Sequence, residues 1–517
     1  MAQDPIREHP QRNTSSTIVA NREEEGFQAL PPSIEGLPAC IEDVRQAGLD
    51  GDTGPVDPTE FNQLRGRLET ARLKLPPLYR ETVFTPYVQT LNELGPTGFN
   101  QVLLRDPARE GAAGLMLDIA HAILQNGEGF NERQTDTFQE VVSDLYDGFL
   151  SAEDRIGVEP PDLGIVPPLV KWGRPDFGPY TFPIEATSTF GCGAAVVSLP
   201  PGNARRGLLA WAALAHETAG HDILSADTGL RAQLIQAVFA ALQANNMDFL
   251  ANYWASRIDE TAADTMGILN MGPAAGIGLV GYFRGLNAAF TGEARLRNQG
   301  PATDPHPADI VRGFLAASTV RLLQFQQADA WGDIIESETR NDVRTIRLAG
   351  RLVSEAEARE SAQLVAETIA KTRLPALENH ALLDIQNWRD LDEEITTQLR
   401  SVLTTATQLP TQFATGIFAA HAVAAAVMVA LDEGSTLSLV FARMIDILKR
   451  MHDGNPSWGP LFVRHPGNLA IHRAYEEFLQ VNRPGQIGPL PGRSPGVAST
   501  TTRRSGARRQ RSPAASE

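Results

Sequence analysis

Apolar residues recur at helical spacing through most of the chain, and this pattern constrains the fold more than any other feature. Neighbours three and four residues apart form the stripe of an amphipathic helix that packs on a core. No repeat of fixed period is visible, which excludes the solenoid families. We therefore expect a mainly α protein of the α+β class. The helical pattern covers 61–75, 227–244, 307–325, 353–372, 388–408, 412–431, 436–451 and 467–480.

Residues 165–201 depart from this pattern, because Pro, Gly and β-forming residues alternate there. The segments Tyr180 to Thr187 and Ala194 to Leu199 are predicted to pair as short strands. We expect one small β-sheet. A strand over 194–199 would be placed to hold an extended peptide by backbone pairing.

The two ends of the chain lack a periodic apolar face. Residues 1–56 mix Pro, Gly, Ser, Thr and charged residues, and only 41–47 favours a helical turn. Residues 483–517 are dominated by Pro, Gly, Ser, Thr and Arg. The predicted organisation is a flexible N-terminal arm over 1–56, a mainly helical body over 57–482 and a disordered basic tail over 483–517.

Charge and cysteine content restrict the partners and the compartment. With 62 acidic and 45 basic side chains the net charge is -17, which repels phosphate backbones and excludes nucleic acid as a partner of the body. Two cysteines without a paired metal-binding motif favour a reducing compartment. The longest apolar run, 416–431, is shorter than a bilayer requires, and no secretory signal is visible. We expect a cytoplasmic protein without membrane insertion; the sequence leaves the oligomeric state open.

The segment His216-Glu217-Thr-Ala-Gly220-His221 follows an apolar helical stretch and carries the chemistry of a metallohydrolase. In such enzymes two histidines on one helix face bind zinc, and the glutamate beside them acts as a base. Four residues usually separate the histidines, whereas five do so here. A five-residue step leaves the rings about 140° apart on a regular α-helix. A π-bulge reduces this to roughly 50°, and Gly220 is a suitable place for it.

A third ligand is expected from the helical segment 252–264, where Glu260 and Asp264 lie four residues apart on one face. A catalytic zinc site commonly has three protein ligands and one open position. Glu260 would complete the ligand set with His216 and His221. Asp264 would accept the ring N–H of one ligand histidine and fix its tautomer.

The two motifs together resemble the paired signature of the dipeptidyl-peptidase III family of zinc exopeptidases, which has a His-Glu-x-x-Gly-His motif and a Glu-Glu-Cys-Arg-Ala-Glu/Asp segment. This chain has Thr and Ala where the family has Cys and Arg, a shorter interval between the motifs and a shorter overall length, and the similarity covers 216–264 alone. The resemblance implies a zincin-like helical metallohydrolase binding one Zn²⁺. The residues that it implies are the ligands His216, His221 and Glu260, the base Glu217 and the supporting carboxylate Asp264.

Further candidates surround these motifs. The segment Thr-Asp-Pro-His306-Pro is similar to the His-Pro segment of zincins related to CAAX prenyl proteases. His306 or Arg312 could stabilise the oxyanion that forms when water attacks a carbonyl. Tyr253, two helical turns before Glu260, is another catalytic candidate. Alternatively, His306 is a helix-entry residue beside Pro307, and Tyr253 packs the core.

The function that these residues predict is that of a zinc metallopeptidase acting on a peptide or protein substrate. Glu217 would be the general base for metal-activated water. Two alternatives remain open: a catalytically inactive helical scaffold that binds a partner and retains a remnant of the metal site, and a zinc hydrolase of non-peptide amides or esters. The intact Glu217 favours hydrolysis over the scaffold.

Overall fold

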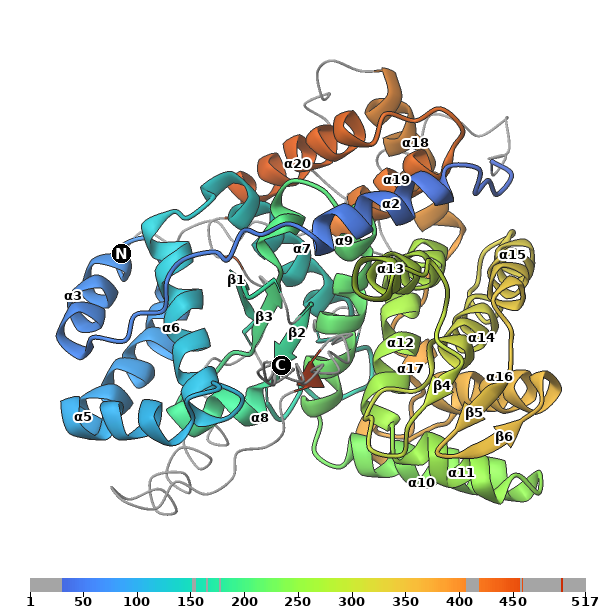
Figure 1. The fold of residues 1–517 in the computed structure, drawn as a ribbon, viewed down its shortest axis with the longest axis horizontal. Coiled ribbons are helices and arrows are strands. Elements are labelled where there is room, and N and C mark those ends of the chain that lie inside the picture. Colours follow the sequence, from blue (N-terminus) through green and yellow to red (C-terminus); the bar gives the residue numbers. More distant parts are fainter. Residues whose placement is uncertain are drawn as a thin grey trace, which may run out of the picture.

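The fold was taken from a computed structural model, which describes residues 30–150, 155–163, 166–175, 178–405, 418–455, 458 and 494–495. Helices dominate these residues, and two small mixed sheets accompany them (Figure 1). The expectation of a mainly helical protein is confirmed. The expectation of a single sheet is wrong, because β4 (Gln299–Gly300), β5 (Ile346–Leu348) and β6 (Arg351–Val353) form a second one.

The first sheet lies at the centre of the molecule in the order β1-β3-β2-β7 (Figure 1). Its strand β3 (Val196–Leu199) pairs parallel with β1 (Leu169–Trp172) and antiparallel with β2 (Tyr180–Phe182). The predicted strand pair is therefore present, but Ile184–Thr187 forms the short helix α8 instead of extending β2. Since β3 lies between two strands, it cannot pair with a peptide as the sequence suggested. The outer neighbour of β2 is β7 (Ser494–Pro495), which runs antiparallel to it.

The two faces of this sheet cover two hydrophobic cores, because side chains alternate along each strand. Val170, Trp172 and Val197 belong to the larger core, while Tyr180 and Phe182 belong to the smaller one. Figure 1 shows the helices of the smaller core on one side of the sheet and most of the others opposite. The smaller core is covered by α3 (Phe61–Ala71), α5 (Thr85–Arg105) and α6 (Ala112–Glu128).

The larger core contains the motif helices α9 (Leu208–His216) and α12 (Ile258–Met271), which pack on α13 (Pro273–Thr291). Helices α14 (Asp309–Val320), α15 (Ala328–Asn341) and α16 (Glu355–Lys371) form a group beside them. The remaining longer helices are α7 (Glu132–Leu150), α10 (Leu230–Ala244), α11 (Asp248–Ala255), α18 (Asp390–Thr405), α19 (Ala419–Leu431) and α20 (Leu437–Gly454). Short helical segments are α4 (Pro77–Tyr79), η1 (Arg80–Phe84), η2 (Ser188–Phe190), η3 (Pro201–Ala204), η5 (Ile223–Ser225), η6 (Pro375–Leu377) and α17 (Leu382–Ile385).

Helix α2 (Leu37–Gly48) corrects the expected boundary of the N-terminal arm. Its buried residues Leu37, Cys40, Val44 and Ala47 form an apolar face that packs against α13. An added Cβ on Gly285 of α13 would lie only 2.5 Å from Val44, so the glycine permits this close approach. A flexible arm is therefore wrong for residues 37–48. Residues 1–29, the predicted helix over 467–480 and the tail over 483–517 lie outside the described residues, except for β7.

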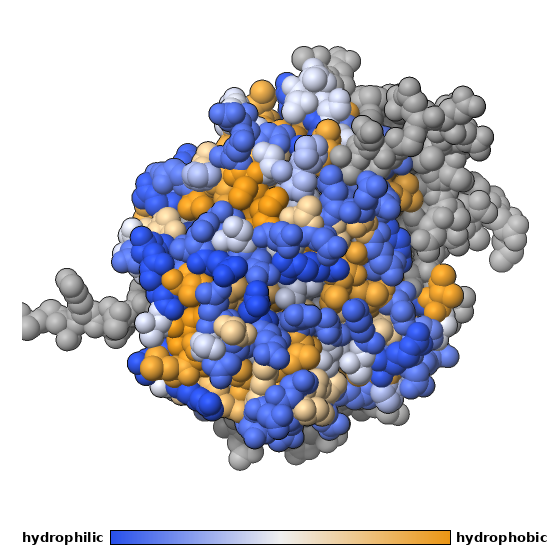
Figure 2. Space-filling model, turned by 90° about the vertical axis from the view of Figure 1, so that its right-hand side faces the viewer, coloured by the Kyte–Doolittle hydropathy of each residue, from blue (hydrophilic) through white to orange (hydrophobic). Residues whose placement is uncertain are grey.

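The surface carries no continuous apolar band on the face drawn in Figure 2, where hydrophilic and hydrophobic side chains are interspersed. Among the residues that the structure describes, no helix combines the length and the apolar character needed to cross a bilayer.

Candidate metal centre

The first motif lies where the buried helix α9 widens into the π-helix η4 (Glu217–Asp222). The predicted widening of this turn is thus confirmed. It brings the two histidine rings together, with Nε2 of His216 and Nε2 of His221 3.1 Å apart. Their ring centroids lie 4.7 Å apart. The extra residue therefore places both imidazoles on one side of the helix, which a regular α-helix would not do.

Gly220 permits the second motif helix to approach this turn. An added Cβ at Gly220 would overlap the Cα and Cβ atoms of Ala263 in α12. Helix α12 packs along η4 and brings Glu260 to the two histidines. The glycine is thus required by the contact between the two motif helices as well as by the wide turn.

Three side chains converge between these helices. Oε2 of Glu260 lies 3.5 Å from Nε2 of His216, and Oε1 lies 3.6 Å from Nε2 of His221. The three side chains offer ligand atoms that all lie within 4.8 Å of one another, and all three residues are buried. Oε2 of Glu260 accepts no hydrogen bond among the described residues, although it is buried. Because a buried carboxylate oxygen without a partner is costly, this group fits a metal ion as its missing partner.

The protonation of the two histidines differs strongly. Burial alone would lower the pKa of His216, but the hydrogen bond with Asp264 and the nearby carboxylate of Glu260 raise it to about 9. Burial lowers the pKa of His221 to about 3. Nε2 of His216 and Nε2 of His221, 3.1 Å apart, cannot both point an N–H at each other, so a single proton lies between them. A cation in this place would interact with both lone pairs instead.

Asp264 holds the ring of His216, as its spacing from Glu260 predicts. Oδ1 of Asp264 accepts a hydrogen bond from Nδ1 of His216 at 2.8 Å, which leaves the lone pair on Nε2 for a ligand. Asp259 points elsewhere and pairs with Arg231. The assignment of ligand and support within 259–264 therefore agrees with the geometry.

Arg312 contacts the supporting carboxylate. Its Nε and Nη2 atoms each donate to Asp264 at 2.7 Å, and Nη1 lies 3.6 Å from Oε2 of Glu260. The guanidinium also stacks on the ring of Phe283. Arg312 thus orients the carboxylate of Asp264. Its Nη1 atom is buried and has no hydrogen-bond partner among the described residues, and its oxyanion role stays a prediction.

Tyr253 anchors the loop that carries His306. Its hydroxyl accepts a hydrogen bond from the backbone N–H of Ala308 at 2.9 Å, and its ring lies under the guanidinium of Arg257. This is a positioning contact, two residues from His306. His306 itself reaches the ligand group, with Nε2 3.4 Å from Oε1 of Glu260. Nδ1 of His306 donates to Asp304 at 2.9 Å, a partner that the sequence analysis did not single out.

Glu217 is buried beside the ligands, and a neighbouring strand holds it. Burial raises its pKa to about 7, while the charge of His216 opposes and that of Glu260 adds to this shift. The hydroxyl of Thr181 in β2 lies 3.0 Å from both Oε2 and the carbonyl oxygen of Glu217. Burial raises the pKa of Tyr282 in α13, and the nearby charge of Glu217 raises it further.

Neither Thr181 nor Tyr282 could be found from spacing, because each comes from an element distant in sequence from the motif. The apolar pattern around them indicates only that they are buried.

No family model, curated protein or solved structure matches the chain. The site is therefore interpreted from its own chemistry. Two imidazole nitrogens and a carboxylate suit a divalent transition metal, because imidazole ligands favour such ions over calcium or magnesium. The buried group of His216, His221 and Glu260 could hold such an ion.

Proposed function

We propose that the chain is a zinc-dependent metallopeptidase. The observation that carries this proposal is the convergence of His216, His221 and Glu260 beside the buried carboxyl group of Glu217. A scaffold without activity has no need for a glutamate in that place. The resemblance of both motifs to the dipeptidyl-peptidase III family supports the same reaction class.

Zinc held by the three ligands would supply a Lewis acid that polarises the scissile carbonyl and lowers the pKa of water. Glu217 would accept a proton from the attacking water and return it to the leaving amine as the C–N bond breaks. Thr181 keeps its carboxyl group in place. Asp264 and Arg312 hold His216 and Glu260 in fixed orientations from behind.

His306 would stabilise the negative charge that develops on the carbonyl oxygen. Its Nε2 atom faces the ligand group, and Asp304 accepts from Nδ1, which favours a protonated ring. Burial opposes protonation, but Glu260 and Asp304 together raise the pKa of His306 above its ordinary value. His306 therefore stands as the best candidate among the further residues.

A peptide substrate is favoured over other amides by the sheet beside the site. Strand β2 carries Thr181, and its outer edge pairs antiparallel with the extended residues of β7. An edge of this kind binds an extended backbone by main-chain hydrogen bonds. Because β7 occupies this edge, the substrate strand is proposed to replace β7 beside β2.

The test combines metal analysis with peptide cleavage on the full purified chain. We expect about one equivalent of zinc in the wild type and in Glu217→Gln, because Glu217 is not a ligand. Cleavage of a mixture of unrelated peptides, followed by mass spectrometry, should fall by roughly 10²- to 10⁴-fold in Glu217→Gln. The exposed Glu81→Gln serves as the matched control. Absence of zinc, or full cleavage by Glu217→Gln, would refute the proposal; cleavage of esters alone would refute the peptidase assignment.

A further inference from the structure

Strand β2 is fixed to the candidate metal centre by two hydrogen bonds. The hydroxyl of Thr181 lies 3.0 Å from Oε2 of Glu217, which begins η4. The backbone N–H of Ile184, just after β2, donates to Oδ1 of Asp222, which ends η4, at 3.3 Å. A strand that lies beside β2 therefore has a defined position relative to Glu217.

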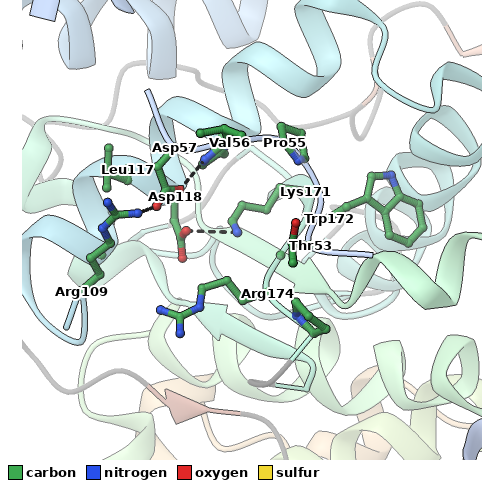
Figure 3. A pocket seen from close by; sticks show the side chains of 14 residues that line it. Thr53, Pro55, Val56, Asp57, Arg109, Leu117, Asp118, Lys171, Trp172 and Arg174 are labelled. Atoms are coloured by element: carbon green, nitrogen blue, oxygen red, sulfur yellow. Dashed lines mark hydrogen bonds and ion pairs between the residues drawn. The ribbon is translucent and has the colours of Figure 1, made fainter. Parts of the chain in front are cut away.

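The opposite face of the sheet holds the same strand. Tyr180 precedes Thr181 in β2, so its side chain points away from Glu217. Its hydroxyl donates to Asp118 at 2.6 Å and accepts from the buried Lys171 at 3.0 Å. Figure 3 shows the ion pair of Asp118 with Lys171 among the side chains that line a cavity on this face. A slip of β2 along its neighbours would break these contacts, so the register of any partner strand is fixed.

The outer edge of β2 is occupied by β7, a segment of the same chain. Strand β7, the dark red arrow in Figure 1, runs antiparallel to β2 with Ser494 opposite Thr181, and the next pair is Pro495 with Tyr180. In an antiparallel ladder, pairs that exchange two backbone hydrogen bonds alternate with pairs that exchange none. Proline has no N–H, so Pro495 and Tyr180 form the pair without bonds. Thr181, which contacts Glu217, is then the residue that exchanges both bonds with Ser494.

The β2 edge requires a partner, but β7 is a small one. All three residues of β2 are buried, and buried backbone N–H and C=O groups are almost always paired. Strand β7 pairs with β2 through two residues, whereas β3 pairs with it through three on the other side. An extended peptide can form the same backbone bonds, so it can replace β7 without leaving the edge unpaired.

We propose that Ser494–Pro495 is an internal, substrate-like ligand of the β2 edge, which external peptides must displace. The incoming peptide needs a backbone N–H opposite Thr181, so proline is excluded there. The position opposite Tyr180 exchanges no hydrogen bond and accepts proline. Strand exchange stands on the ladder alone, whereas its consequence, inhibition of peptide cleavage, rests on the proposed function.

Variants of Ser494 in the full chain test the internal ligand. The probe is a fluorescent peptide with the sequence of residues 488–499, and Glu217→Gln is present in every chain so that the probe is not cleaved. Ser494→Pro removes the N–H that pairs with Thr181, so fluorescence anisotropy should show probe binding about 3- to 10-fold tighter than to the parent chain. Ser494→Ala keeps this N–H and is the matched control. Equal affinities of the Ser494→Pro and Ser494→Ala chains, or no saturable binding, would overturn the proposal.

Substitutions in the probe test the register without changing the protein further. Binding to the Ser494→Pro chain is compared for two altered probes. Proline in place of the serine that corresponds to Ser494 should weaken binding about 3- to 10-fold, because the N–H opposite Thr181 is lost. Alanine in place of the proline that corresponds to Pro495 should leave the affinity unchanged. The reverse order of the two effects would overturn the assigned register.

Turnover separates this inference from the proposed function. With Glu217 intact, Ser494→Pro should lower KM for peptide cleavage about 3- to 10-fold and leave kcat unchanged, because the internal segment competes with the substrate. Probe binding that follows these rules in a chain without any cleavage would refute the peptidase and support strand exchange. Cleavage that depends on Glu217, with the same KM in Ser494→Pro and Ser494→Ala, would support the peptidase and overturn the inhibitory role of β7.

Discussion

The guanidinium of Arg312 donates to both carboxylate oxygens of Asp264, at 2.7 Å each. The same carboxylate accepts a hydrogen bond from His216. One buried ion pair therefore orients a candidate metal ligand, and breaking the pair leaves an uncompensated charge in the core. Such a loss costs about 3–5 kcal/mol, so the pair supports the fold as well as the site.

Replacement of Asp264 should weaken metal binding more than replacement of its neighbour. Asp264→Asn removes the charge that orients His216 and should lower zinc affinity by about 10- to 100-fold, with a lower melting temperature because Arg312 loses its partner. Asp259→Asn touches a partly exposed pair with Arg231 and should leave zinc affinity near the wild-type value. Titration against a competing chelator measures both. A larger effect of Asp259→Asn would mean that the ligand register is wrong.

Gly220 should not tolerate a side chain. In Gly220→Ala the new methyl group overlaps the backbone of Ala263, so either η4 or α12 must move. Overpacking of this kind costs about 1–3 kcal/mol, and zinc affinity should fall with it because the two helices carry different ligands. Gly66→Ala is the control, since it lies on an exposed face of α3 with nothing within 4 Å. It should be neutral or stabilise slightly in a thermal melt. Equal stability of both variants would show that the helix contact is looser than described.

Replacement of Thr181 should lower kcat without changing the zinc content. Thr181→Val keeps the shape of the side chain but loses the hydroxyl that holds Glu217. One lost hydrogen bond is worth about 1 kcal/mol, so kcat should fall roughly five- to tenfold while KM and zinc content stay near the wild type. Thr181→Ser should restore kcat. A purely structural role would lower the melting temperature and leave kcat per folded molecule unchanged.

Glu140 should make stability depend on pH. Burial, with a further contribution from Asp144, raises the pKa of Glu140 to about 8. The unfolded chain ionises this group near pH 4.3, so the folded protein holds an extra proton between about pH 4.3 and pH 8. The free energy of unfolding therefore falls as pH rises through this window. Above about pH 8 Glu140 is ionised in both states and adds no further pH dependence.

Glu140→Gln removes that dependence, because an amide cannot ionise. Its stability relative to the wild type should increase from pH 5 to pH 8 in urea denaturation curves. The neighbouring polar groups are Asn455, at 3.5 Å, and Nδ1 of His452, at 3.8 Å; both remain in the variant. Glu69→Gln on an exposed part of α3 is the control. If the unfolding free energies of the wild type and of Glu140→Gln differ by the same amount from pH 5 to pH 8, the folded protein does not hold an extra proton on Glu140.

Local spacing was sufficient to predict that His216, His221 and Glu260 come together, because the two histidines lie on one helical segment and Glu260 and Asp264 share another. Contacts between distant segments could not be predicted in this way. Thr181 reaches Glu217 through the sheet, and Arg312 reaches Asp264 from α14; both contacts depend on tertiary packing. The sequence analysis named Arg312 as a candidate for stabilising an oxyanion, and its contact with Asp264 was not predicted.

The errors in the predicted fold have similar causes. Helix α2 has a recognisable apolar face, but it is short and lies among Pro- and Gly-rich residues that favour an irregular assignment. Helix α13 is buried on nearly all sides, so it lacks the polar face from which helical periodicity is recognised. Strands β4 to β6 have only two or three residues each, too few for an alternating pattern to be distinguished.

The wide turn of η4 differs from a regular helical turn by a single residue. In evolutionary terms, the loss of one codon at Ala219 would convert the motif into the four-residue spacing that an ordinary α-helix presents on one face. The turns after Ser225 could absorb the shift before α10 begins at Leu230. Two geometries of a metal-binding helix are thus one insertion apart, and a lineage could pass between them without replacing any of its ligands.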